Sequence, residues 1–155
     1  MTNKISEVLD PRVITLNLDV KDKHDAITKL ASLLNDADYI DDIPSFVKDI
    51  YVREGEGITG IGDGIAIPHG KSDYVTNVGV AIGILNHPIK WETLDDKPVN
   101  IIILFAVSND VEAARNQLKL LSMFAGRLGH ENVISKLQEA QSVDDVISIF
   151  TKEEV

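Results

Sequence analysis

Two apolar segments constrain the fold of this chain more than any other feature of its sequence. Residues 78–85 and residues 99–107 are almost entirely apolar, with Asn100 as the polar interruption of the second segment. Both segments have the length of a strand and are far too short to cross a membrane. Strands that are apolar at successive positions are typical of sheets covered on both faces. The two segments therefore predict a layered α/β sheet.

Further elements are expected before these two segments. Residues 13–18 are apolar and rich in β-branched side chains, which favours a first strand. Asp22 is the expected N-cap of a helix whose apolar residues recur at helical spacing. Pro44 is expected to open a second helix, which ends at Gly55 and Gly57. Strands and helices mixed along one chain predict an α/β sandwich.

The C-terminal third is expected to be helical, with one long helix that ends at Gly129 and shorter helices after it. Apolar residues of the long helix repeat at alternating spacings of three and four, which predicts one buried stripe. The members of this stripe are Val111, Ala114, Leu118, Leu121, Ala125 and Leu128. Ser142 and Asp145 form a capping-box pattern at the start of the last helix.

The composition suits one domain that spans residues 1–155. The chain is 44% apolar, and a chain of this length can bury a core of its own. It has no cysteine, which excludes disulfides, thiolate metal sites and a cysteine nucleophile.

Residues 1–12 lack the apolar centre of a signal peptide, so we expect a cytoplasmic protein. The net charge of −10 argues against nucleic acid or an anionic membrane as partner and favours a protein with a basic face, although a solubilising acidic surface explains it equally well.

His69 is the strongest candidate for chemistry among the four histidines, and the other three fit ordinary surface positions. It follows a very short apolar strand that Pro68 ends, so its ring is expected at a strand end. Gly70 adds no side chain beside it, and the glycines at 60, 62 and 64 are expected to place bare backbone nearby. Backbone N–H groups bind anions, and a neutral imidazole offers a lone pair to a phosphoryl group. The residues alone also allow a purely structural histidine.

Other chemistries fit the sequence poorly. Gly70, Lys71 and Ser72 resemble the end of a phosphate-binding P-loop, but Ile65 occupies the position of its first glycine and a strand is expected to follow. The glycines from 60 to 64 lack the third glycine of a dinucleotide-binding fingerprint. No second histidine stands at metal-ligand spacing from His69, and the chain has no G-x-S-x-G motif for a hydrolytic triad.

Arg53 is the second candidate residue. In the last turn of the helix that Pro44 opens, its positive charge would complement the negative end of the helix dipole. A guanidinium in this place could also hold phosphoryl oxygens through two hydrogen bonds. Periodicity does not separate these roles, and one side chain can serve both.

The segment from Arg53 to Gly70 reads REGEGITGIGDGIAIPHG. It resembles the signature of enzyme IIA of the bacterial phosphoenolpyruvate-dependent sugar phosphotransferase system, of the fructose/mannitol type. The order of the expected elements resembles this family over nearly the whole chain, so residues 1–155 are interpreted as one such domain. The resemblance implies a mixed sheet flanked by helices on both faces. It also implies that His69 is the phosphoryl-accepting nucleophile and that Arg53 supports the phosphoryl group.

The same resemblance implies a phosphocarrier. The small protein HPr, itself phosphorylated on a histidine, would donate its phosphoryl group to His69. His69 would pass the group to a cysteine of enzyme IIB, and the membrane component IIC would take part only indirectly. No metal or other cofactor is implied, because the donor already carries an activated phosphoryl group. The alternative is a nitrogen-type regulatory member of the family, which signals by binding other proteins according to its phosphorylation state.

The chain departs from the family's pattern at Gln117. Many members carry a second histidine at the start of a His-Leu-x-x-Leu run, which here reads QLKLL from Gln117. This residue is expected at the edge of the buried stripe, directed towards the site. Its amide could donate a hydrogen bond to a phosphoryl oxygen but carries no titrating proton.

Overall fold

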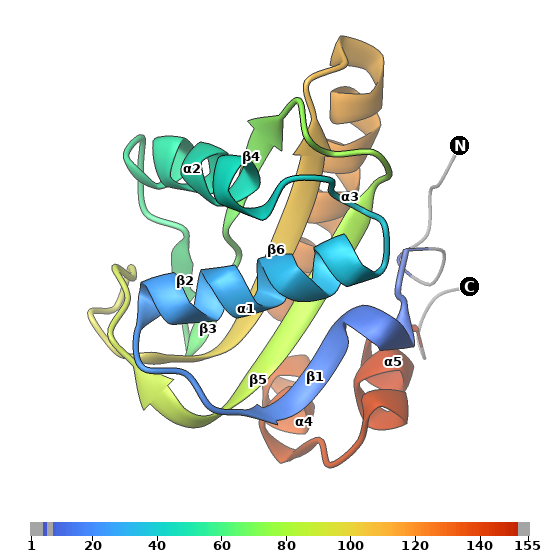
Figure 1. Ribbon diagram of the computed structural model, residues 1–155. Helices are drawn as coiled ribbons and strands as arrows, with labels where there is room; N and C mark the ends of the chain where they lie inside the picture. Colours follow the sequence, from blue (N-terminus) through green and yellow to red (C-terminus); the bar gives the residue numbers. More distant parts are fainter. Residues whose placement is uncertain (1–4, 6–7, 152–155) are drawn as a thin grey trace.

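The computed structural model describes residue 5 and residues 8–151. In this part of the chain a six-stranded sheet is surrounded by helices (Figure 1). The strands are β1 (Ile14–Leu18), β2 (Gly60–Gly62), β3 (Ile65–Ala66), β4 (His69–Ser72), β5 (Gly79–Ile89) and β6 (Val99–Ser108). The helices are the one-turn η2 (Pro11–Val13), α1 (Lys23–Asp36), α2 (Ile43–Glu54), α3 (Val111–Leu128), α4 (Glu131–Glu139) and α5 (Val143–Thr151). The predicted domain limits of 1–155 include residues outside this description and stay a prediction.

The sheet is mixed, and the two strands from the apolar segments form its centre. Strand β5 is antiparallel to β6 and parallel to β1, which gives the order β1-β5-β6-β3-β2. Strands β3 and β4 both run parallel to β6 and lie one after the other along its length. Ile65 stands opposite Ile101 in β6, and His69 stands opposite Phe105.

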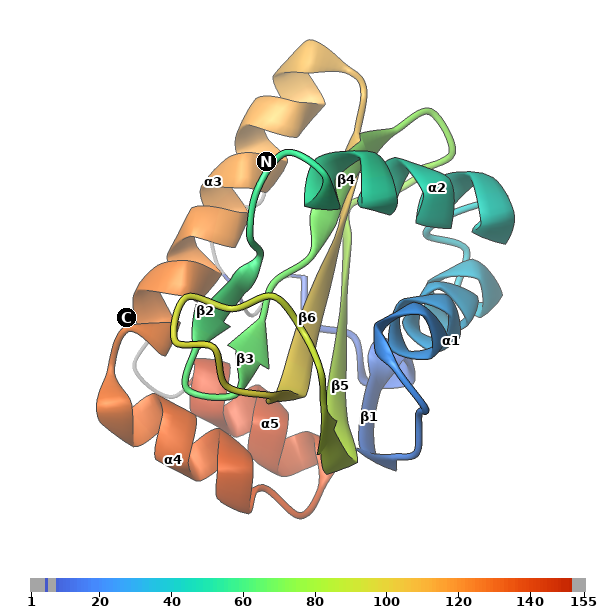
Figure 2. The same ribbon diagram turned by 90° about the vertical axis from the view of Figure 1, so that its left-hand side faces the viewer.

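Helices cover both faces of the sheet, as predicted (Figure 2). Strand β6 shows why, because its side chains alternate between two separate cores. Ile102 and Leu104 join the core under α1 and α2, whereas Ile103 and Phe105 join the core under α3, α4 and α5. Both sets are fully buried, so the strand has to be apolar at successive positions. The predicted fold class is confirmed.

Local signals begin and end the helices close to the predicted positions. The Asp22 side chain accepts the N–H of Asp25 and caps α1. Helix α2 begins at Ile43, one residue before Pro44, and Gly55 caps its C-terminus. Ser142 accepts the N–H of Asp145 at the start of α5, as the capping pattern predicted.

Strand β5 and the buried face of α3 differ from the predictions. Strand β5 extends to Ile89, beyond the apolar segment that predicted it. The predicted stripe on α3 is wrong at two positions, because Val111 is 74% and Leu118 is 37% exposed. The residues that α3 does bury are Ala114, Gln117, Leu120, Phe124 and Leu128. Phe124 decides this orientation, since its ring packs between two other buried aromatic rings, Phe105 and Phe150.

Candidate functional site

His69 is the first residue of β4. Helix α2 crosses this strand (Figures 1 and 2). Gly70 makes the close crossing possible. A Cβ atom at this position would lie 2.8 Å from the backbone oxygen of Asp49 and 3.2 Å from the Cα of Ile50, both in α2. The packing of helix against strand therefore brings the last turn of α2, which carries Arg53, to the ring of His69.

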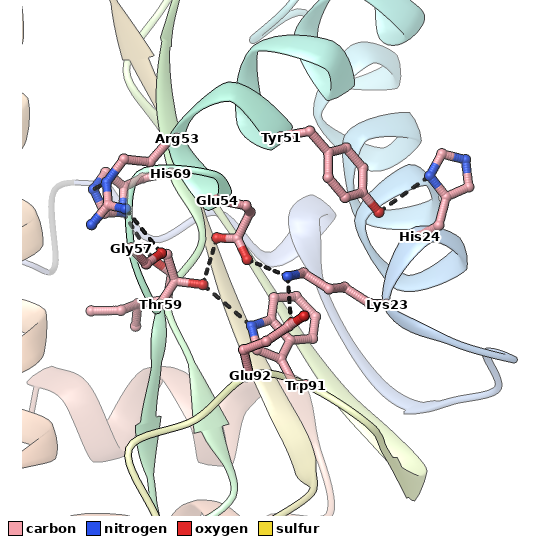
Figure 3. Close-up of polar contacts among 11 residues, drawn as sticks. Lys23, His24, Tyr51, Arg53, Glu54, Gly57, Thr59, His69, Trp91 and Glu92 are labelled. Carbon is pink, nitrogen blue, oxygen red and sulfur yellow. Dashed lines mark hydrogen bonds and ion pairs between the residues drawn. The ribbon is translucent and has the colours of Figure 1, made fainter. Parts of the chain in front are cut away.

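Hydrogen bonds fix the orientation of the half-buried His69 ring (Figure 3). Its Nδ1 lies 3.0 Å from the carbonyl oxygen of Ile67. Because a carbonyl oxygen only accepts, Nδ1 carries the proton and donates it to this bond. Arg53 donates from Nε to the other ring nitrogen, Nε2, over 3.2 Å. The ring therefore presents the lone pair of Nε2 towards the guanidinium.

The surroundings of His69 favour the neutral ring. Burial lowers the pKa of His69 below its ordinary value of 6.5, and the positive charge of Arg53 acts in the same direction. The hydrogen bond to Ile67 opposes this shift. A lowered pKa keeps the imidazole unprotonated at neutral pH, which is the state that a nitrogen nucleophile requires.

Arg53 occupies the last turn of α2, as predicted, so its charge lies at the negative end of the helix dipole. It also contacts the site, because Nη1 donates to the carbonyl oxygen of Gly57 over 3.2 Å while Nε faces His69. The dipole interpretation and the site interpretation are thus compatible with one position of the side chain.

A cavity of about 390 Å³ opens beside the His69 ring. Its walls combine cationic, acidic and apolar side chains from α2, the loop after α2, β4, β6 and α3. They are Asp49, Val52, Arg53, Glu56, His69, Gly70, Lys71, Val107 and Leu118. Sequence reasoning missed Lys71 as a site residue. The signal was its spacing, since residues two apart in a strand point to the same face.

The three upstream glycines do not lie where we expected them. Gly60 packs against Thr93, Gly62 faces Asp95, and Gly64 faces Asn100 near the start of β6. None of the three lines the cavity at His69, so the predicted nest of bare backbone at the ring is wrong. They belong to the tight β2–β3 hairpin, in which Gly62 and Gly64 adopt positive φ angles of 97° and 84°.

Gln117 is buried, 7% exposed, in the middle of the α3 face that packs on the sheet. Its Oε1 accepts the backbone N–H of Ser108, the last residue of β6, over 2.6 Å. It does not line the cavity at His69. The predicted position at the edge of a stripe is therefore wrong, because the true buried face is rotated towards Gln117.

The fold and the site together define a class of protein: an α/β domain that presents one neutral histidine beside an arginine. Residues 7–153 match the family "Phosphoenolpyruvate-dependent sugar phosphotransferase system, EIIA 2". The chain belongs to this family. No helix in the described part of the chain has the length and apolar character needed to cross a membrane.

Curated relatives include both transport components and regulatory proteins. The chain is 35% identical to a fructose-specific EIIA component of Haloferax volcanii, over 93% of this chain and 94% of the relative. It is 34% identical to the fructose-specific EIIABC component of Bacillus subtilis over 96% of this chain, but it spans only 23% of that protein. It is 39% identical to the nitrogen regulatory protein of Escherichia coli, over 68% of this chain and 64% of the relative.

Solved structures share the fold over almost the entire chain. The nitrogen regulatory protein IIA-Ntr of Neisseria meningitidis matches with a TM-score of 0.86 at 28% identity, covering 95% of this chain and 99% of that chain. Mannitol enzyme IIA of Escherichia coli, solved in complex with phosphorylated enzyme IIB, matches with a TM-score of 0.78 at 23% identity. That match covers 94% of this chain and 98% of the other.

Proposed function

We propose that this protein is a cytoplasmic phosphocarrier that accepts a phosphoryl group on His69 from phospho-HPr and passes it to a cysteine of enzyme IIB. The single observation that supports this most is the arrangement of the ring. Nδ1 donates a hydrogen bond to the Ile67 carbonyl. Nε2 carries the lone pair and lies next to the guanidinium of Arg53. A neutral nitrogen nucleophile with a cation beside it suits the uptake of an anionic group.

The transfer balances without moving a proton when the donor ring carries a proton on its other nitrogen, because the donor then leaves as a neutral imidazole. The lone pair of Nε2 forms the new N–P bond while the N–P bond of the donor histidine breaks, and its electron pair returns to the donor ring. Nδ1 keeps its proton and its bond to Ile67 throughout. Arg53 moves its hydrogen bond from Nε2 to the phosphoryl oxygens, and Lys71, which lines the same cavity, adds a second positive charge.

The surface around His69 suits docking by another protein. Val52 and Leu118 are exposed apolar side chains that line the cavity from α2 and α3. Asp49 and Glu56 add negative charge on the α2 side, which suits a donor with a basic face. The solved complex of mannitol enzyme IIA with phosphorylated enzyme IIB supports the second partner by analogy.

The experiment is incubation with phosphoenolpyruvate, enzyme I and HPr, followed by mapping of the acid-labile phosphate. We expect one phosphoryl group, on His69, and none in His69→Ala. His87→Ala is the matched control, because His87 is exposed and distant in sequence, and it should label normally. Labelling that persists in His69→Ala would reject His69 as the acceptor.

The regulatory relatives support a second candidate, a nitrogen-type regulator that binds proteins according to its phosphorylation state. Its support is the match to the Neisseria meningitidis regulatory protein, whose TM-score of 0.86 exceeds that of the mannitol enzyme. Phosphoryl transfer to an enzyme IIB cysteine distinguishes the two. Phospho-His69 that is never discharged by any IIB of the source organism would favour the regulator.

The role of Gln117 as a hydrogen-bond donor to the phosphoryl group stays a prediction. The bond between its Oε1 and Ser108 favours a structural role instead.

A further inference from the structure

A series of hydrogen-bonded polar groups lies next to Arg53, on the side away from His69 (Figure 3). We call it the Glu54 network, and its members are Lys23, Glu54, Thr59 and Trp91. The Glu54 side chain is only 6% exposed and binds Lys23 Nζ at 2.5 Å. Its other oxygen lies 2.6 Å from the hydroxyl of Thr59, which in turn lies 3.2 Å from Nε1 of Trp91.

Only one arrangement of protons satisfies this network. An indole N–H can only donate, so Thr59 accepts from Trp91 and has to donate its single proton to Glu54. Glu54 therefore accepts as a carboxylate, and Lys23 supplies the matching charge. Burial opposes the charged form of Lys23, but its hydrogen bonds to Glu54 and Glu92 raise its pKa overall. A buried network that is satisfied in one way only holds its members in fixed positions.

The network and the site hold the same loop from two sides. Residues 55–59 connect α2 to β2, and Arg53 and Glu54 are the last two residues of α2 before them. Arg53 donates to the carbonyl of Gly57 in this loop, while Glu54 accepts from Thr59 at its end. Figure 3 shows Arg53 and His69 on one side of the loop and Lys23 and Trp91 on the other.

We propose that Glu54 and Thr59 are positioning residues for the phosphoryl-transfer site. By fixing the loop and the end of α2, they hold the Arg53 guanidinium at Nε2 of His69. Their effect on transfer rests on the function proposed above, whereas their effect on the contact between Arg53 and His69 does not. Neither residue lines the cavity at His69, although the negative charge of Glu54 acts on the pKa of the ring from outside it.

The decisive variant is Thr59→Val, which keeps the side-chain shape and removes the hydroxyl that links Glu54 to Trp91. The matched control is Thr93→Val. Thr93 is also buried and packs against Gly60 near the same loop, but its hydroxyl donates to the carbonyl of Lys97 and not to a member of the network. Thr59→Ser keeps the hydroxyl and should behave as the wild type.

Two readouts are measured for each variant. In an NMR titration of the His69 ring, Thr59→Val should raise the pKa of His69 towards its ordinary value, because the charge of Arg53 is no longer held beside it. In transfer from phospho-HPr, Thr59→Val should lower kcat roughly 10- to 100-fold at an unchanged KM, as expected for a misplaced catalytic group. Thr93→Val should change neither quantity.

The results separate this proposal from the proposed function. If the wild type takes up no phosphoryl group, the function is rejected, and the His69 titration still decides the positioning role. A Thr59→Val protein that loses stability but keeps the wild-type pKa of His69 and the wild-type kcat overturns the proposal. If Thr59→Val does not fold, Thr59→Ala replaces it, because it removes the same hydroxyl and leaves the charge of Glu54 in place. An unchanged His69 titration and an unchanged kcat in that variant overturn the proposal in the same way.

Discussion

Replacement of Gly70 by alanine tests the link between helix packing and the site. Gly70 pairs with Ala106 in the sheet and faces α2. The added methyl group would meet the backbone oxygen of Asp49 at 2.8 Å and the Cα of Ile50 at 3.2 Å. Backbone atoms cannot rotate away as a side chain does, so α2 as a whole must move away from β4.

The size of the effect follows from these distances. The Asp49 oxygen has to recede by about 0.6 Å to reach ordinary contact at 3.4 Å. Overpacking of this kind costs about 1–3 kcal/mol, and the reduced freedom of the unfolded chain returns about 0.4–1 kcal/mol. Because α2 carries Arg53 and β4 carries His69, their contact of 3.2 Å opens with the same movement. A misplacement of this size should slow phosphoryl uptake about 10-fold, since 1 Å can cost about 100-fold.

Urea unfolding measures the first effect, and the initial rate of phosphoryl uptake from phospho-HPr measures the second. The control is Gly126→Ala in α3, where the added Cβ would meet nothing within 4 Å. It should gain up to about 1 kcal/mol from helix propensity and take up phosphate at the wild-type rate. A Gly70→Ala protein with wild-type stability and wild-type uptake would refute the close packing of α2 on β4 as the basis of the site.

Three further predictions concern the ring, the core and the buried amide. Because burial and Arg53 lower the pKa of His69 below its ordinary value of 6.5, the midpoint of the fall in uptake should lie below pH 6.5. The stability that the neutral ring contributes is present above pH 6.5 and is lost as the pH falls through the lowered pKa. A midpoint of the initial rates above pH 7 would contradict this. Phe124→Ala should lower the free energy of unfolding by about 3–5 kcal/mol, because the ring is fully buried between two other aromatic rings. Urea titration measures this change, and a loss below about 1 kcal/mol would argue against that packing. Gln117→Leu should cost about 1–3 kcal/mol by leaving the Ser108 N–H unpaired, with little change in uptake; a large loss of uptake at full stability would instead support a bond from Gln117 to the phosphoryl group.

Much of the fold could be predicted because its signals are local. The apolar segments at 78–85 and 99–107 gave the two central strands, and Asp22 and Gly55 gave helix ends within a residue or two. His69 and Arg53 could be paired because the family's motif carries both. The geometry itself, with Arg53 donating to the ring, came only from the structure.

The errors arose where tertiary contacts choose between equal local patterns. Helix α3 has apolar residues on two adjacent rows, and only the partners of Phe124 decide which row is buried. Because the row of Phe124 is the buried one, Gln117 also lies on the buried face of α3. The glycines of the β2–β3 hairpin looked suitable for anion binding, but their direction depends on pairing with β6 and on the loop around Thr93. The Glu54 network was missed because its members are far apart in sequence.

The partner of His69 Nδ1 is a main-chain oxygen, that of Ile67, and not a side chain. Substitution of Ile67 changes its side chain but leaves this oxygen in the molecule. In the proposed transfer, the choice of Nε2 as the reactive nitrogen therefore does not depend on which side chain stands at position 67. Substitutions at the edge of the cavity would change which proteins can dock there, and the orientation of the imidazole would stay the same.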